Sequence, residues 1–151
     1  MNKNVLAVLI PFIAVAGLSI GFVWWDRGAP PGFDPTPYPV TVDEVTREHR
    51  GVRIRGTAHF VVRINQTMTD GETYWLFPLM EPGDTLSREI KVLVRAQRAP
   101  DHLVTFEDLA VEGLARPPGR MVDPKARETF LDGGYDFVEG YVLVEAFHIE
   151  G

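Results

Sequence analysis

The sequence contains no cysteine. This absence excludes disulfides, thiolate metal sites and cysteine nucleophiles together, and it gives no indication of the redox compartment. Serine is almost as scarce, since it occurs only as Ser19 and Ser87, and neither lies in a GxSxG or SxxK motif. We therefore do not expect serine-hydrolase chemistry.

The motifs that cradle phosphate groups are also missing, because the chain has no Walker A sequence and no GxGxxG that opens a helix. The four histidines show neither HxxH nor HExxH spacing; they stand at positions 49, 59, 102 and 148. A net charge of −6 argues against a nucleic-acid binder held by a general positive field. The sequence thus predicts no cofactor and no nucleic-acid partner.

What the chain does have is a long uncharged run at residues 4–25. As a helix, these 22 residues would span about 33 Å, close to the thickness of the hydrocarbon core. Trp24 and Trp25 stand where an interfacial aromatic belt is expected, and Asp26 and Arg27 end the run. The run predicts a transmembrane anchor in residues 1–25, which places the protein in a lipid bilayer.

A cleaved signal peptide is the alternative, because Ala14-Val15-Ala16 has the form of a cleavage site. The apolar run continues past that site, which favours the uncleaved anchor. Lys3 precedes the run, whereas Arg27 is offset by Asp26, so positive-inside counting favours a cytoplasmic N-terminus. We expect a single-pass protein of the cytoplasmic (inner) membrane with an extracytoplasmic C-terminal domain.

Residues 26–40 form a second region, in which five of the fifteen residues are proline. Such a composition favours extended polyproline conformations, so the region is expected to be a semi-rigid linker. One compact domain is expected to follow at residues 41–151, because this part contains alternating apolar runs separated by turn residues.

This domain is predicted to be mainly β. Expected strands, separated by turn signals such as Asp70-Gly71, lie at residues 52–64, 73–80, 88–96, 109–115 and 141–149, with a possible extra strand at 42–48. In 88–96, Ile90, Val92 and Val94 are expected to point inward. One helix is expected at 124–132, with Asp123 as N-cap, Pro124 at its first position and Gly133 at its exit.

The order of these elements favours a small OB-like barrel or a curled antiparallel sheet. Gly56 lies in the middle of the longest strand, where a barrel strand would bend sharply. The helix lies before the last strand, whereas OB folds usually place it between the third and fourth strands. A membrane anchor with an OB-like barrel resembles the haem chaperones of cytochrome c maturation in topology alone. Their C-terminal histidine and tyrosine motif is absent, because only Ile149-Glu150-Gly151 follows His148.

Strict alternation over residues 50–64 places Val52, Ile54 and Phe60 on one face, which is a core face. The opposite face carries a basic stripe, extended by a neighbouring strand; it comprises Arg53, Arg55, His59, Arg63, Lys91 and Arg95. Three interpretations stay open: cross-strand pairing with Glu72, Glu89 or Glu112, a protein partner, or anionic lipid.

The segment 73–80 is apolar on both faces, because Tyr74, Leu76 and Met80 lie opposite Trp75, Phe77 and Leu79. Either the helix covers the second face or another protein does. Tyr74 and Leu76 are therefore candidate partner-binding residues beside the basic stripe.

Two other classes of function remain as alternatives. The first is a small-ligand or metal carrier that uses His59 and His148, both on expected strands. The second is an acid–base enzyme that uses loop carboxylates, for which Glu107-Asp108, Asp132 and Asp136 are the candidates. The leading expectation is a non-enzymatic accessory or scaffold protein that presents its β domain to a membrane protein complex or a periplasmic protein.

Overall fold

The structure is a computed structural model that describes residues 37–48, 51–98 and 104–151. The expected anchor at 4–25 and residues 26–36 of the expected linker lie outside the described residues. Within the described ranges, no helix combines the length and the apolar character that a membrane crossing requires.

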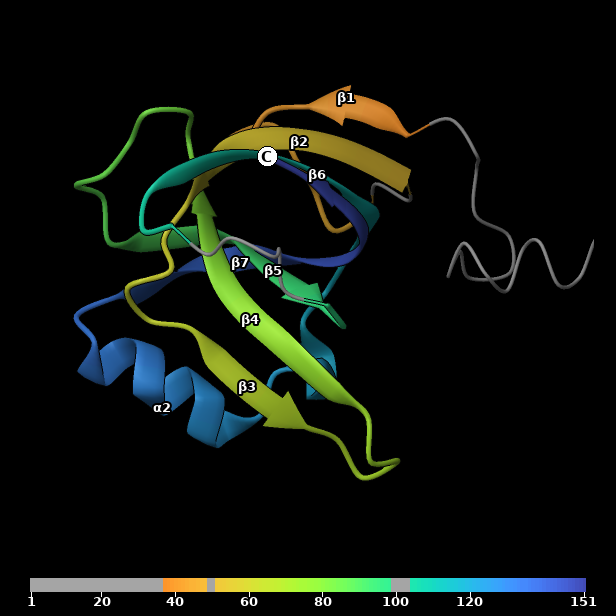
Figure 1. Ribbon diagram of the computed structural model, residues 1–151, viewed down its shortest axis with the longest axis vertical. Helices are drawn as coiled ribbons and strands as arrows, with labels where there is room; N and C mark the ends of the chain where they lie inside the picture. Colours follow the sequence, from red (N-terminus) through yellow and green to blue (C-terminus); the bar gives the residue numbers. More distant parts are fainter. Residues whose placement is uncertain (1–36, 49–50, 99–103) are drawn as a thin grey trace, which may run out of the picture. The chain divides into compact units, whose positions relative to one another are not determined.

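Seven strands and two short helices make up the described chain. They are β1 (Tyr38–Val40), β2 (Gly51–Ala58), β3 (Ile64–Thr67), β4 (Thr73–Met80), β5 (Glu89–Ala96), β6 (Glu107–Arg116), the 3₁₀ helix η1 (Gly119–Met121), α2 (Pro124–Asp132) and β7 (Asp136–Glu150). Five strands close into a barrel in the order β2-β6-β7-β5-β4 and back to β2 (Figure 1). The expectation of a mainly β barrel with one short α-helix is confirmed.

The barrel closes over a short seam. β2 pairs with β6 along its whole length, but it pairs with β4 only at Thr57–Met80 and Ala58–Leu79. A Cβ atom on Gly56 would lie 2.3 Å from the carbonyl oxygen of Met80, so β4 can approach only because residue 56 is glycine. The glycine expected to mark a bend therefore marks the point of closure.

Apolar side chains from all five barrel strands fill the interior. The largest contributors are Val52, Ile54, Phe77, Leu79, Val92, Val94, Leu109, Val111, Val142 and Val144, joined by Phe60 from the loop after β2. In a barrel of so few strands the inward side chains meet and pack against one another. The interior of the barrel is thus a packed apolar core.

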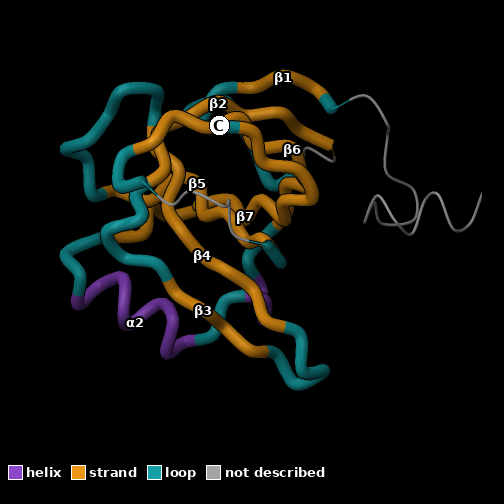
Figure 2. The backbone as a smooth tube through the Cα atoms, in the orientation of Figure 1, coloured by secondary structure: helices purple, strands orange, loops and turns teal. Residues whose placement is uncertain are grey.

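Helix α2 covers a second apolar cluster outside the barrel. Its residues Ala126 and Phe130 pack with Leu76, Leu93 and Leu143 from the outer faces of β4, β5 and β7. Burial of Phe130, which is fully inaccessible, contributes on the order of 1.5–3 kcal/mol. Figure 2 shows α2 beside the short strand β3, which extends the sheet from β4. The helix therefore covers the second face of segment 73–80, one of the two expected alternatives.

The helix has the bounds that its sequence predicts. The Asp123 carboxylate accepts a hydrogen bond of 2.8 Å from the backbone N–H of Lys125, and Pro124 occupies the first turn. Both features satisfy or remove a backbone donor that an α-helix leaves unpaired at its start. The start of α2 is therefore determined by neighbouring residues in the sequence, the Asp123 cap and Pro124.

The expected strand at 52–64 is wrong as a single element, because it consists of β2 and β3 separated by an irregular segment at 59–63. Phe60 packs into the barrel interior, whereas Val62 packs against the outer cluster. A loop whose side chains are buried in alternate directions has the same sequence pattern as a strand.

The extra strand expected at 42–48 is also wrong. Residues 41–45 form a turn in which the N–H of Val45 donates to the carbonyl of Thr41 at 3.1 Å, and Val42 and Val45 are buried in the barrel core. The first strand is β1, which lies inside the expected linker and pairs in parallel with β2. Tyr38 lies beside Val52 and Val40 beside Ile54.

Ile90 differs from its expected direction. Val92 and Val94 belong to the barrel core, whereas Ile90 belongs to the outer cluster. The pairing of β5 with β7 is irregular at this point, because β7 advances from Phe137 to Val142 while β5 advances from Ile90 to Val92.

Candidate functional site

The expected basic stripe does not form a free row of cations. Arg53 lies 3.1 Å from Glu112 and 3.2 Å from Glu150, so the expected pairing with Glu112 is present. Lys91 pairs with Asp43. Arg55 and Arg63 are exposed. We call the outer faces of β2, β5, β6 and β7 the barrel wall; most of its cations are neutralised by neighbours.

Arg95 is buried, with 4% of its surface accessible, in contrast to the exposed position expected for it. Its Nη1 donates to a Glu145 oxygen at 2.9 Å, and Arg116 binds the other oxygen of Glu145 at 3.0 Å. The guanidinium lies 3.5 Å from the centre of the Tyr74 ring, a cation–π contact. Tyr74 is thus engaged within the domain.

Leu76 is fully buried under α2, so it is not part of a surface that a partner reaches. The sequence marked this strand correctly as apolar on both faces. The covering element is the chain's own helix.

His59 departs furthest from expectation. It was expected on the exposed face with the arginines, but none of its surface is accessible. Its Nε2 lies 2.7 Å from the carbonyl oxygen of Asp84, and its Nδ1 lies 3.0 Å from the hydroxyl of Tyr135. The edge of the ring also meets Phe106, with 4.9 Å between the ring centres. β2 ends at Ala58, so the alternation that predicted exposure no longer applies at residue 59.

The hydrogen bonds assign the tautomer of His59. A carbonyl oxygen can only accept, so Nε2 carries the proton and donates to Asp84, and Nδ1 accepts from the Tyr135 hydroxyl. Burial lowers the pKa of His59 below its ordinary value; the hydrogen bond to Asp84 opposes this shift, and the Arg88 charge adds to it. Burial raises the pKa of Tyr135, which keeps its hydroxyl a donor. The site therefore holds a neutral imidazole.

The loop that contains Asp84 is ordered by its own polar groups. The Asp84 carboxylate accepts from the N–H groups of Leu86 and Ser87 at 3.0 and 2.9 Å, which lowers the pKa of Asp84. Nη1 of Arg88 donates to the carbonyls of residues 85, 86 and 87 at 3.3, 3.3 and 2.9 Å. The loop thus has one conformation while its tip stays in solvent.

Two further contacts tie this loop to the barrel. The N–H of Gly83 donates to the hydroxyl of Thr57 at 2.7 Å, and that hydroxyl also bonds to the carboxylate of Asp108. The N–H of Asp136 donates to the carbonyl of Arg88 at 2.8 Å. β2, β6 and β7 therefore all hold the segment 81–88.

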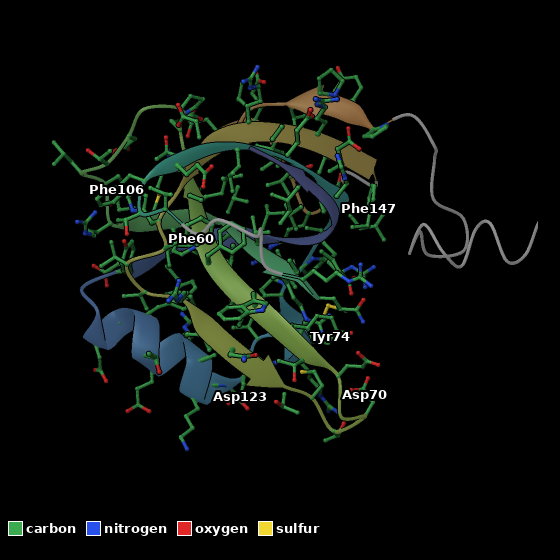
Figure 3. The ribbon with its side chains drawn as sticks, in the orientation of Figure 1. Phe60, Asp70, Tyr74, Phe106, Asp123 and Phe147 are labelled. Atoms are coloured by element: carbon green, nitrogen blue, oxygen red, sulfur yellow. The ribbon has the colours of Figure 1, made fainter. Side chains whose placement is uncertain are left out.

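The same end of the barrel receives two other segments. The N–H of Phe106 donates to the carbonyl of Ala58 at 3.1 Å, and Phe106 adopts a positive φ of 61°. A Cβ on Gly133 would lie 2.5 Å from a methyl group of Val62, so this glycine lets segment 59–63 pack against the end of α2. Figure 3 shows Phe106 on the side of the barrel where loop 81–88 projects. We call the segments 59–63, 81–88 and 104–106 the loop end.

Each segment of the loop end exposes one apolar side chain. The accessible fractions are 57% for Val61, 85% for Leu86 and 59% for Val104. We call these three side chains the apolar triad. They surround a buried histidine that the three segments share.

The residues of the two other candidate classes do not converge. Ala58, next to His59, pairs with Glu107, whereas His148 pairs with Glu112, so the two histidines are about five residues apart along β6, roughly 17 Å. Among residues 37–48, 51–98 and 104–151, no three metal-binding side chains come together. Asp108 is bound to Thr57, and Asp132 and Asp136 are exposed.

Neither a protein-family model, nor a curated protein, nor a solved structure matches this chain. A functional assignment therefore depends on the geometry of its own residues. The sequence did not indicate three residues that surround His59: Tyr135, Asp84 and Phe106. They come together with the histidine only in the folded chain. Leu86 did carry a signal, since it is an apolar residue between the polar residues of a turn.

Proposed function

We propose that this chain is a single-pass, membrane-anchored accessory protein without catalytic activity. It presents its β domain outside the cytoplasm to a membrane protein complex or a periplasmic protein. The anchor is the uncharged run at 4–25, and the proline-rich region after it is the tether.

The observation that carries this proposal is the direction in which the chain enters the barrel. β1 begins at Tyr38, beside Val52, and runs parallel to β2. β2 then continues to Ala58, about 20 Å further along the strand, where the loop end starts. In Figure 1, β1 enters on the right, and loop 81–88 projects on the left. Tyr38, where the described chain enters the domain, therefore lies at the end of β2 remote from the loop end.

The filled interior supports a binding role on the outer surface. The apolar core inside the barrel offers no polar groups to a ligand, and the polar side chains of the wall largely satisfy one another. An accessory protein needs an ordered outer surface at a fixed position and no interior ligand site. A barrel with a packed apolar interior is compatible with that role.

We further propose that the barrel is OB-like. In chain order, β2, β4, β5, β6 and β7 are barrel strands one to five, and their spatial order is 1-2-3-5-4. OB-fold domains bind oligonucleotides on the face of strands two and three. In this chain, α2 covers the outer apolar side chains of these two strands, and the net charge is −6. Both facts support the absence of a nucleic-acid partner.

Site-specific photo-crosslinking in host membranes tests this function. A photoreactive amino acid is placed, one position at a time, at Arg55 on the wall, Thr69 in the β3–β4 turn, Leu86 at the loop end and Lys125 on α2, all of which are exposed. We expect the full chain to stay in the membrane pellet after an alkaline wash, and at least one position to yield an adduct with a membrane or periplasmic protein. A chain released by the wash, or one without a protein adduct at any position, would contradict the proposal.

A further inference from the structure

The apolar triad lies at one end of the barrel, because each of its members is two residues from a group that contacts the buried histidine. Val61 follows His59 by two residues, Leu86 follows Asp84 by two, and Val104 precedes Phe106 by two. Two residues of extended chain span about 7 Å. His59 therefore fixes three exposed apolar side chains around a common centre.

Leu86 is prepared for binding before any partner arrives. Its own N–H is held by the Asp84 carboxylate and its carbonyl by Arg88, yet 85% of its surface is accessible. A partner that buries this side chain would pay little entropy to order the loop.

Two arginines flank the triad, and neither lies within ion-pair distance of a carboxylate in the described part of the chain. Arg63 follows Val61 by two residues and Arg88 follows Leu86 by two, and both are exposed. Neither forms an ion pair with a carboxylate of the described residues, unlike Arg53, Arg95 and Arg116 on the wall. The surface thus offers apolar contact together with the guanidinium of Arg63 and the positive charge of Arg88, whose Nη1 already binds carbonyls of its own loop.

We propose that the loop end docks a segment of a partner protein in which an apolar side chain is flanked by carboxylates. This inference rests on the proposed function and names the surface that performs it. Carboxylates complement Arg63 and Arg88, and arginine binds them with two parallel hydrogen bonds.

Two other occupants fit less well. A second copy would bring the same arginines against each other, because a two-fold interface joins identical patches. A lipid surface offers anionic head groups to the arginines but no folded segment that could pack against the exposed side chain of Leu86. Both become outcomes of the test.

The test uses the full chain in host membranes, with a photoreactive amino acid at residue 86 and, as control, at Thr69, which is exposed on another hairpin. The crosslinked segment of the partner is then mapped by mass spectrometry. We expect a protein adduct from position 86 and none from position 69, and the mapped segment should contain an apolar residue with Asp or Glu beside it.

Charge reversal completes the design. Arg63→Glu should reduce the yield of the adduct at position 86 about tenfold. Arg55→Glu, which makes the same charge change on the wall, should leave the yield unchanged. Because both arginines are exposed and unpaired with described carboxylates, neither change removes an ion pair of the domain.

Several outcomes would overturn the inference. They are an adduct of position 86 with lipid or with a second copy, a mapped segment without carboxylates, or equal effects of the two charge reversals. Protein adducts at other positions with none at 86 would also overturn it, while the proposed function would stand. Failure at all positions would remove both.

Discussion

On the barrel wall, cations lie against carboxylates, as Arg53 does with Glu112 and Glu150, whereas at the loop end Arg63 and Arg88 have no ion pair with a described carboxylate. The loop end also differs in which side chains it buries, because it buries the polar His59 and exposes the apolar Leu86. Charges that satisfy one another make a surface soluble. Charges beside exposed apolar side chains form the surface that we propose for docking.

The largest difference between the two regions should appear when a histidine is removed. His59→Ala leaves the Tyr135 hydroxyl and the Asp84 carbonyl without their partner and opens a cavity, so we expect a loss of about 3–5 kcal/mol in the free energy of unfolding. His148 is exposed on β7, and His148→Ala should change this value by less than about 0.5 kcal/mol. Urea unfolding of the full chain in detergent, followed by near-UV circular dichroism, measures both. Equal losses would mean that His59 is not the centre of the loop end.

The wall itself contains a matched pair of glutamates. Glu145→Gln removes the charge that faces the buried Arg95, whose side chain is 5% accessible, and we expect a loss of about 2 kcal/mol. Glu112→Gln removes a charge that faces Arg53, whose side chain is 47% accessible, and solvent reduces the expected loss to below about 0.5 kcal/mol. The same unfolding experiment compares them. A larger loss for Glu112→Gln would show that the burial of an ion pair does not determine how much it contributes to stability in this domain.

The sequence predicts those elements whose causes are local. The bounds of α2 follow from Asp123 and Pro124, and the bounds of β4 follow from the turns at Asp70-Gly71 and Pro82-Gly83. The sequence marks Gly56 as a bend, but the reason for the glycine, the close approach of the Met80 carbonyl from β4, is a tertiary contact that the sequence does not show.

The site could not be predicted, because His59 is positioned by residues 25 and 76 positions away along the chain. Alternation describes a residue only while its strand continues, and β2 ends one residue before the histidine. In the same way, Arg95 alternates outward as expected, yet Tyr74 and Glu145 cover it. Alternation along a strand predicts the direction of a side chain, but only the tertiary structure shows which residues cover that side chain.

Acid should lower the stability of the domain through the buried His59. The folded domain holds His59 neutral and its pKa is lowered, so the unfolded chain binds one more proton once the pH falls below the ordinary value of 6.5. The free energy of unfolding should therefore decrease from about pH 6.5 downward, until the pH reaches the lowered pKa of the folded state. Unfolding curves between pH 7.5 and 5, compared for the wild type and for His59→Gln, measure this contribution. We expect the decrease to be smaller in His59→Gln than in the wild type.

The smallest expected effect on stability concerns the unpaired cations. Arg63→Gln removes no ion pair with a described carboxylate, so the free energy of unfolding should change by less than about 0.5 kcal/mol. The adduct yield at position 86 should nevertheless fall. A loss of stability as large as that of Glu145→Gln would mean that Arg63 has a structural role and that the contrast between wall and loop end is wrong.

The state of His59 can be observed directly by nitrogen NMR of the full chain labelled with ¹⁵N-histidine in detergent. We predict that one of the four imidazoles, assigned to His59 by its absence in His59→Gln, keeps the signature of the neutral Nε2–H tautomer as the pH is lowered through 6.5. If the His59 signal titrates at the ordinary value or shows the Nδ1–H tautomer, the three loops are not held by this histidine, and the docking surface built on them is contradicted.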